Sequence, residues 1–297
     1  MKIIITGATG LVGTILLQYL ESLKIDSDII CLVRATSNLE YIKNLDLNLR
    51  YFTGDSGTQK TWHDLISQET PDLIIHIASI NHVQLILNSL SQVDKQPRII
   101  VIGSTGVYSK FRQAAQLKQE METQLEDYSG SYCLLRPTMI YGSPRDKNIH
   151  RLVKFCDRRG FFPIFGSGEN LLQPIHAEDL AQALLSVYQN PQLQGAYDLS
   201  GGSIVSFKEL INLISEYLGK PVRQISLPLN LGVWSATMLE NLLQSKSPVR
   251  GEQILRLQEN KAFPHDRAKQ DFGFSPRTLE VGLKQEIELM RQQGLIS

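Results

Sequence analysis

Three glycines directly follow the first apolar segment of the chain. Residues 6–13 read TGATGLVG, with Gly7 placed to turn off a strand, Gly10 to let a pyrophosphate approach the backbone, and Gly13 to permit close packing of a helix. Uncovered backbone amides and the positive end of a helix dipole bind phosphate at such a loop. The sequence therefore predicts a dinucleotide site here. The other residues of the predicted loop are Thr9, Leu11 and Val12.

The end of the second expected strand, residues 28–33, favours one dinucleotide over the other. An acidic side chain at this point selects NAD through the ribose hydroxyls, whereas arginine accommodates the additional phosphate of NADP. Here Arg34 follows the strand, with hydroxyls at Thr36 and Ser37 and no carboxylate at the tip. NADP is therefore preferred as the cofactor, and NAD is the alternative.

The elements that must position this loop alternate along the first half of the chain. Several strands, such as residues 99–102, are apolar through most of their length, which indicates burial on both faces and a parallel sheet covered by helices. We expect an α/β fold with a Rossmann-type doubly wound parallel sheet. The expected strands are 2–6, 28–33, 49–53, 72–78, 98–102 and 132–136, and the helices 11–23, 62–67, 83–90 and 113–128.

The pattern changes after residue 141. Turn-rich stretches at 142–144 and 162–168 are followed by helical segments with few strands between them. This predicts a dinucleotide-binding domain over residues 1–148 and a smaller, mostly helical C-terminal substrate lobe over 149–297, with 177–200 packing back on the first domain. The helices expected in this half are 177–188, 207–218, 231–242 and 278–292.

Composition excludes several classes of function. The chain has 297 residues, 42% of them hydrophobic, and its 30 basic residues balance its 30 acidic ones. A neutral protein of this kind has no broad surface for nucleic acid or an anionic membrane. No apolar run approaches the about 18 residues of a membrane span, and neither the cysteines nor the histidines have metal-ligand spacing. We expect a cytoplasmic protein with no metal.

Further motifs follow the glycine loop in a fixed order. They are 54–55 (GD), 75–79 (IHIAS), 102–108 (IGSTGVY), 135–142 (LRPTMIYG), 164–168 (IFGSG), 173–181 (QPIHAEDLA), 266–268 (DRA) and 272–276 (FGFSP). Together they resemble the extended and atypical branch of the short-chain dehydrogenases/reductases, which contains the NAD-dependent epimerase/dehydratase-like proteins. The resemblance covers nearly the whole chain.

The resemblance implies where the remaining cofactor contacts lie. It places Asp55 and the adjacent Ser56 at the adenine, and the fourth strand along the cofactor. It places the segment after Arg136 beside the nicotinamide, and the lysine of the family's catalytic motif at the nicotinamide ribose. The residues so implied are Asp55, Ser56, His76, Ile77, Ala78, Lys118, Pro137, Thr138 and Met139.

One catalytic residue of the family is missing. Its members use a serine after the fifth strand and a Tyr-x-x-x-Lys motif, in which the lysine lowers the phenol pKa so that the phenolate takes a proton as hydride leaves. Ser104 matches the serine, and Lys118 matches the lysine. Four residues before Lys118, however, stands Ala114, whose methyl group transfers no proton.

Three interpretations remain open, so the sequence leaves it undecided whether the protein is an enzyme. Another group handles the proton, Tyr108 first, with Tyr141 and His82 as further candidates. Alternatively, the protein binds NAD(P)H without turnover, as a regulator, redox sensor or assembly factor. In the third interpretation, the bound cofactor and Ser104 carry out a reduction in which water or the substrate supplies the proton.

The resemblance also implies a substrate held between the lobes, an NDP-sugar or a related compound. His176, Glu178 and Asp179 look like a catalytic cluster, but their spacing is typical of a helix start whose acidic residues complement the dipole. A homodimer through residues 113–128 is a further expectation. The predicted substrate contacts are Ser79, Tyr141, Asn170, Gln173 and Arg250, the last in a turn where its guanidinium can clamp phosphate.

Overall fold

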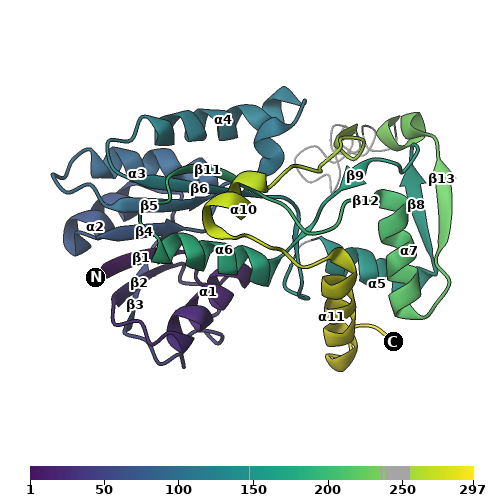
Figure 1. The fold of residues 1–297 in the computed structure, drawn as a ribbon, viewed down its shortest axis with the longest axis horizontal. Helices are drawn as coiled ribbons and strands as arrows, with labels where there is room; N and C mark the ends of the chain where they lie inside the picture. The colour runs from purple at the N-terminus through teal and green to yellow at the C-terminus, as the bar shows by residue number, and fades with distance from the viewer. Residues whose placement is uncertain (147, 235–236, 238–254) are drawn as a thin grey trace.

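A seven-stranded parallel sheet forms the centre of the larger lobe (Figure 1). The computed structural model describes residues 1–146, 148–234, 237 and 255–297. The strands of the sheet are β1 (Lys2–Thr6), β2 (Asp28–Val33), β3 (Leu49–Thr53), β4 (Leu73–His76), β5 (Arg98–Ile102), β6 (Tyr132–Pro137) and β11 (Gly195–Leu199). Their order is β11-β6-β5-β4-β1-β2-β3, so the chain reverses its direction across the sheet between β1 and β4. Ligands of open α/β sheets bind at the carboxyl ends of the strands at such a reversal.

Helices cover both faces of this sheet. One face buries α1 and α6 against Ile3, Ile5 and Cys31, and the other buries α2, α3 and α4 against Ile4, Ile30 and Ile74. The alternation of these side chains between the two cores explains why the strands are apolar throughout. The predicted doubly wound α/β fold is confirmed. The helices are α1 (Leu11–Ser22), α2 (Gln59–Glu69), α3 (Val83–Leu90), α4 (Arg112–Glu126) and α6 (Ala177–Gln189).

The smaller lobe is built around three helices and several short strand pairs. Its helices α5 (Ile149–Arg159), α7 (Phe207–Leu218) and α11 (Leu279–Gln292) share a core. The lobe was expected to have few strands, but two-residue strands carry no readable alternation and were missed. These strands are β7 (Ile140–Tyr141), β9 (Leu171–Leu172), β10 (Ile175–His176) and β12 (Val205–Ser206), with the longer parallel pair β8 (Phe161–Phe165) and β13 (Arg223–Leu227).

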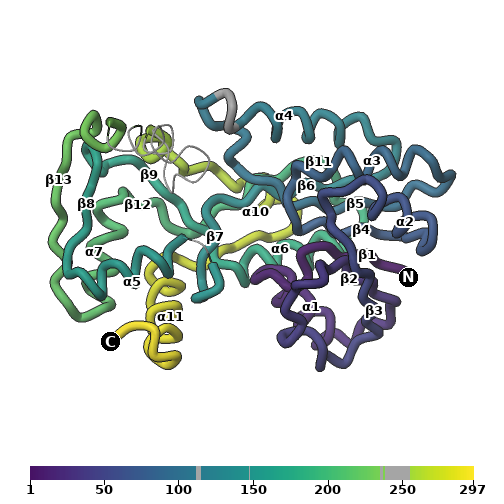
Figure 2. Tube along the Cα trace, turned by 180° about the vertical axis from the view of Figure 1, so that it is seen from behind, coloured from purple at the N-terminus to yellow at the C-terminus, as the bar shows by residue number. Residues whose placement is uncertain are grey.

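Residues from the second half of the chain complete the larger lobe. Helix α6 packs against α1, β11 pairs with β6, and α10 (Asp266–Phe272) lies against β11. Figure 2 shows the same arrangement from behind, with the C-terminus beside α11 in the smaller lobe. The division into 1–148 and 149–297 stays a prediction, and most of the helix expected over 231–242 lies outside the described residues.

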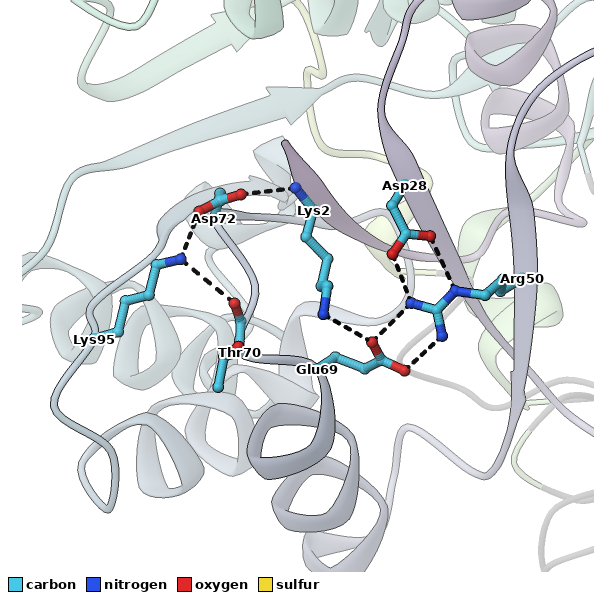
Figure 3. Close-up of polar contacts among 7 residues, drawn as sticks. All are labelled: Lys2, Asp28, Arg50, Glu69, Thr70, Asp72 and Lys95. Atoms are coloured by element: carbon cyan, nitrogen blue, oxygen red, sulfur yellow. Dashed lines mark hydrogen bonds and ion pairs between the residues drawn. The ribbon is translucent and has the colours of Figure 1, made fainter.

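Charged side chains join the amino-terminal ends of the strands, at the edge opposite to the glycine loop. Arg50 of β3 donates two hydrogen bonds to Asp28 of β2, at 3.0 and 2.7 Å, and two to Glu69 at the end of α2, both at 2.8 Å (Figure 3). Lys2 pairs with the same Glu69 at 3.3 Å. The guanidinium thus connects two strands and one helix, and hydrogen bonds from it lower the pKa of both carboxyl groups.

Replacing Arg50 with methionine removes four charge-assisted hydrogen bonds. We expect Arg50→Met to lower the free energy of unfolding by about 1 kcal/mol near neutral pH, since the groups are partly exposed and solvent screens them. Both carboxyl pKa values are depressed in the folded state. The contribution is therefore complete above their ordinary values of 3.8 and 4.5, and it is lost as the pH falls through the lower, folded-state values.

Urea unfolding of the wild type and of Arg50→Met at about pH 7 and about pH 3 measures this difference in the free energy of unfolding. The control is Lys60→Met, which removes the exposed pair of Lys60 with Asp64 at 2.5 Å and is expected to change stability little. An equal effect of Arg50→Met at both pH values would contradict the electrostatic explanation.

Candidate functional site

The glycine loop lies at the carboxyl end of β1, where the strand order reverses. Gly7 has a φ of +69°, and a Cβ atom on it would lie 3.1 Å from the backbone nitrogen of Ala78 and 3.2 Å from the Cβ of Ile77. A Cβ atom on Gly13 would lie 2.2 Å from the carbonyl oxygen of Gly7. Glycine is therefore favoured at Gly7 by its positive φ and by the closeness of residues 77–78. It is required at Gly13 because α1 lies too close to the turn for any side chain.

The first turn of α1 leaves its amides open. Gly10 is its N-cap residue, is exposed, and caps the helix without a side-chain hydrogen bond. The backbone amide of Gly10 donates to the carbonyl of Gly7 at 2.9 Å, which fixes the loop below the helix. Leu11 and Val12 open the helix. Such an uncovered N-terminus, positive through the helix dipole, is suited to a phosphate group.

A guanidinium from a distant segment lies on this loop. Arg145 follows β7, and its Nη2 donates to the carbonyl oxygen of Thr9 at 2.7 Å and to the hydroxyl of Thr14 at 3.4 Å. The same guanidinium lies 4.1 Å from the ring centre of Tyr41. Arginine binds phosphate with paired donors. Arg145 was not predicted from the sequence, where its only signal was its position in a turn shortly after residues 135–142.

Two buried carboxyl groups hold the segment that carries Arg145. The amide of Gly142 donates to Oε2 of Glu286 in α11 at 3.1 Å, and Asp146 accepts from the amide of Asn148 at 2.6 Å. His150 lies 3.2 Å from the Asp146 carboxylate. Burial and the neighbouring Asp146 carboxyl raise the pKa of Glu286 to about 9. The C-terminal helix thereby fixes the position of a group at the glycine loop.

Glu286→Gln mimics the protonated form of this carboxyl group. Its pKa is raised in the folded protein, so wild-type stability falls as the pH rises from the ordinary value of 4.5 toward about 9, because only the unfolded chain loses the proton. We expect the variant to be more stable than wild type at about pH 8 and nearly equal to it at about pH 4. Thermal unfolding across this range measures it, with the exposed Glu288→Gln of the same helix as control. A variant less stable than wild type at the higher pH would contradict a neutral Glu286.

The residues expected around the adenosine lie at the surface near the ends of β2 and β3. Arg34 is exposed, and its backbone amide donates to the hydroxyl of Ser37 at 3.0 Å. Asp55 accepts from the amide of Gly57 at 2.9 Å, and Ser56 lies 3.1 Å from Nδ1 of His82. The carboxylate of Asp55 and the hydroxyl of Ser56 thus shape the turn before α2. Their contacts with a cofactor stay predictions.

The side chain of His76 does not lie where the resemblance implies. It is fully buried, with Nδ1 at 2.8 Å from the hydroxyl of Thr6 and Nε2 at 2.8 Å from the carbonyl of Ser79. Burial lowers its pKa to about 4, so the ring is neutral and connects two strand ends. Ile77 and Ala78 adjoin Gly7, and Ser79 caps the short helical turn Ile80–His82. The contacts of Ile77 and Ala78 with a cofactor stay predictions.

Ser104 and Lys118 both lie beside Gly106, and Ser104 and Gly106 line the cleft between the lobes. Ser104 follows β5 and accepts a hydrogen bond from the amide of Gly106 at 3.0 Å. A Cβ atom on Gly106 would lie 3.2 Å from the Ser104 hydroxyl and 3.4 Å from Cε of Lys118. Burial lowers the pKa of Lys118, and the nearby Arg256 lowers it further. Ala114 stands one turn before Lys118 in α4.

Tyr108 lines the cleft, but its hydroxyl is engaged elsewhere. It donates to the carboxylate of Asp198 at 2.9 Å and accepts from Nη1 of Arg136 at 3.1 Å. Arg136 is paired in turn with the buried Glu122 at 2.6 Å. Burial and Asp198 raise the pKa of Tyr108 to about 12, so the phenol keeps its proton near neutral pH. The geometry supports a role in positioning rather than in proton transfer.

Two predicted substrate contacts lie in the core instead of the cleft. Tyr141 is fully buried, with its ring edge-on to His176 at 5.3 Å, because strand β7 turns it toward α11. Gln173 is buried, and its amide bonds Gly201 and Phe263. Neither side chain is free to meet a substrate in this arrangement. Asn170 lines the cleft, while Arg250 lies outside the described residues.

The apparent catalytic cluster is a helix start, as expected. His176 caps α6 by accepting from the amide of Glu178 at 3.3 Å, and Asp179 pairs with Arg277 at 3.0 Å. Within the described part of the chain, no group of three or more His, Cys, Asp or Glu side chains is placed to hold a metal ion. None of the described helices is both long and apolar enough to cross a membrane.

The cleft itself has a volume of about 1430 Å³. It begins at the ends of β5 and β6, where Pro137, Thr138 and Met139 lie, and extends between α5, β8 and the segment 255–263. It therefore reaches from the Ser104–Lys118 pair into the smaller lobe. This is the place where substrate was expected from the sequence.

Comparison with known sequences supports the family resemblance. Residues 3–93 match the model of the NAD dependent epimerase/dehydratase family. The chain is 24% identical to UDP-glucose 4-epimerase of Vibrio cholerae over 98% of its length and 96% of the relative. It is 24% identical to short-chain dehydrogenase/reductase family 42E member 1 of Mus musculus, over 54% of this chain and 44% of that protein, so it spans less than half of that relative.

A shorter match concerns a subunit of a large complex. The NADH dehydrogenase [ubiquinone] 1 alpha subcomplex subunit 9 of Dictyostelium discoideum is 29% identical over 27% of this chain and 22% of that protein.

Solved structures extend the likeness to the whole fold. UDP-glucose 4-epimerase from Thermotoga maritima, solved with UDP-glucose, superposes with a TM-score of 0.72 at 17% identity and covers 99% of both chains. UDP-glucuronic acid 4-epimerase from Bacillus cereus, in complex with UDP-glucuronic acid and NAD, gives 0.74 at 16% identity and covers 99% of this chain and all of that one. This chain is thus similar to the NAD-dependent epimerases and dehydratases of the extended short-chain dehydrogenase/reductase type, with a family-model match over residues 3–93 and a likeness in fold over nearly its whole length.

Proposed function

We propose that this chain binds NADP or NAD and acts as an oxidoreductase-like protein of the epimerase/dehydratase type. The observation that carries the proposal is the approach of α1 to the turn after β1, which excludes a Cβ atom at Gly13 and leaves the first turn of the helix uncapped. A diphosphate would rest on these amides. Arg145 and the exposed Arg34 would add positive charge at its two sides.

The bound nicotinamide would supply or accept a hydride. Around it, the Ser104 hydroxyl would hydrogen-bond the reacting oxygen of a substrate, and Lys118 would hold the ribose hydroxyls. Tyr108 would keep its proton, because Asp198 accepts it as a hydrogen bond. With Ala114 in place of the family tyrosine, water or the substrate would supply the proton for any turnover.

The second candidate function is binding without catalysis, as a regulator, redox sensor or assembly factor. Two observations favour it: the absence of a tyrosine at position 114, and the local similarity to the Dictyostelium NADH dehydrogenase subunit. The preference for NADP, the NDP-sugar substrate and the cytoplasmic location stay predictions. A homodimer through α4 also remains a proposal, supported by the exposure of Leu117, at 43%, on this helix.

Arg145 offers a test of the cofactor site that leaves the residues of the glycine loop unchanged. We expect Arg145→Met to weaken binding of NADPH about tenfold, corresponding to about 1.4 kcal/mol, through loss of a phosphate-facing guanidinium. Calorimetric titration of NADPH and NADH into purified protein measures it. Arg158→Met, at an exposed position near the end of α5, is the matched control and should bind as wild type. Absence of binding heat for both coenzymes in the wild type would refute the proposed function.

Turnover distinguishes the two candidate functions. An enzyme should oxidise or reduce bound cofactor with some substrate, followed by absorbance of the reduced nicotinamide, and Ser104→Ala should abolish the change while leaving cofactor affinity nearly unaltered. A non-catalytic binder shows no turnover and tolerates Ser104→Ala. Ala114→Tyr places a tyrosine four residues before Lys118, as in the family motif. A gain of activity in that variant would show that the missing phenol limits catalysis.

A further inference from the structure

The cleft between the lobes has walls that are mainly aromatic and aliphatic. Phe155 and Phe162 of the smaller lobe meet edge to face at 5.3 Å, and Phe162 meets Phe207 in the same way at 5.6 Å. Leu152 of α5 and Leu257 continue this surface, and Leu257 is 44% exposed. Burial of such a surface by an apolar ligand is favourable, since it removes the surface from water.

Polar side chains in the cleft are largely engaged within the protein. Thr138 donates its hydroxyl hydrogen to the carbonyl of Gln173 at 2.5 Å, and the amide nitrogen of Gln258 donates to the carbonyl of Phe165 at 2.8 Å. A sugar ring requires partners for several hydroxyls, and leaving them unpaired is costly. Other lining side chains with a hydrogen bond inside the protein are Ser104, Thr105, Tyr108, Ser109, Asn148, Glu259 and Asn260.

Positive charge gathers at one end of the cleft. Lys261 and Arg256 line it, and Lys118 adjoins it. Burial lowers the pKa of both Lys261 and Lys118, and repulsion from Arg256 lowers both further. Glu259 acts in the opposite direction on Lys261, and Glu122 does so on Lys118. An anion placed there relieves this repulsion.

Among the described residues that line the cleft, Glu259 carries the one carboxylate, which is too little negative charge to balance these cations. Glu259 lies 4.0 Å from Nε of Arg256, but it is engaged by the hydroxyl of Ser109 at 2.9 Å and the amide of Lys110 at 2.7 Å. Among the described residues, the cationic side chains at this end therefore outnumber the carboxylates. The charge of the cleft complements an anionic group.

We propose that the cleft takes an amphipathic anion, with a carboxylate or phosphate head against Lys261 and Arg256 and a large apolar body along the phenylalanine wall. This rests on the proposed function and deepens it by naming a ligand class, as the alternative to the NDP-sugar that the resemblance implies. At about 1430 Å³, the cleft exceeds the usual size of a small-molecule site, about 300–1,000 Å³, and has room for such a body beside a nicotinamide.

The test uses cis-parinarate, an anionic polyene whose fluorescence rises in apolar surroundings. We expect saturable binding to the full chain, unaffected by UDP-glucose. Lys261→Met removes the charge contact and Leu257→Gln the apolar one, and each should weaken binding about fivefold. The matched controls are Lys60→Met on α2 and Val281→Gln on α11, both at exposed positions away from the cleft, and these should bind parinarate as wild type.

Displacement of parinarate by UDP-glucose, or equal binding by all four variants and the wild type, would overturn the inference. Leu257 is a surface position, so its variant stays informative even if Lys261→Met folds poorly. Titration of NADPH into the same samples tests the proposed function separately, since all variants should bind it equally. A wild type that binds parinarate but not NADPH would refute the cofactor site and leave the ligand class of the cleft intact.

Discussion

The contact between the carbonyl of Gly7 and Cα of Gly13 sets the position of everything around the proposed cofactor site. Because no side chain fits there, α1 approaches β1 closely, and its open first turn points at the carboxyl edge of the sheet. Ala78 at the end of β4 closes the same turn from the other side. Arg145 then reaches the loop from a segment that follows β7, fixed by Glu286 of the last helix. The glycine loop near the N-terminus is thus linked, through Arg145, to a helix near the C-terminus.

The larger lobe could be predicted from the sequence because its strands are buried on both faces. Continuous apolar runs such as Ile3–Ile5, together with the three glycines, indicated the type and order of the elements and the family resemblance. The short strands of the smaller lobe could not, since two residues carry no period, and β11 pairs with β6 only through tertiary structure. Side-chain direction was the least predictable property. Tyr141, Gln173 and His76 occupy the expected segments, but their side chains face the core. The contact of Arg145 with the glycine loop could not be predicted, because it depends on how the tertiary structure places the segment after β7.

The chemistry of the cleft departs from what the motifs alone imply. The serine and lysine lie together, yet the only tyrosine that lines the cleft among the described residues is held by Asp198 and Arg136. The charged pair Arg136–Glu122 lies directly behind it and fixes the guanidinium. This network stabilises a protonated phenol. It is consistent with a site whose positive charge comes from lysine and arginine side chains and whose remaining walls are apolar.

Strand β11 has a consequence for how the molecule is made. When β6 has just been synthesised, it is still a free edge of the sheet. Its partner β11 follows only after residues 138–194, which form part of the smaller lobe and α6. The strands of the sheet therefore cannot all pair as they are synthesised, because β6 must wait for β11. Parallel pairing over this sequence distance is slow, so the half-made sheet is the species most exposed to aggregation on the ribosome.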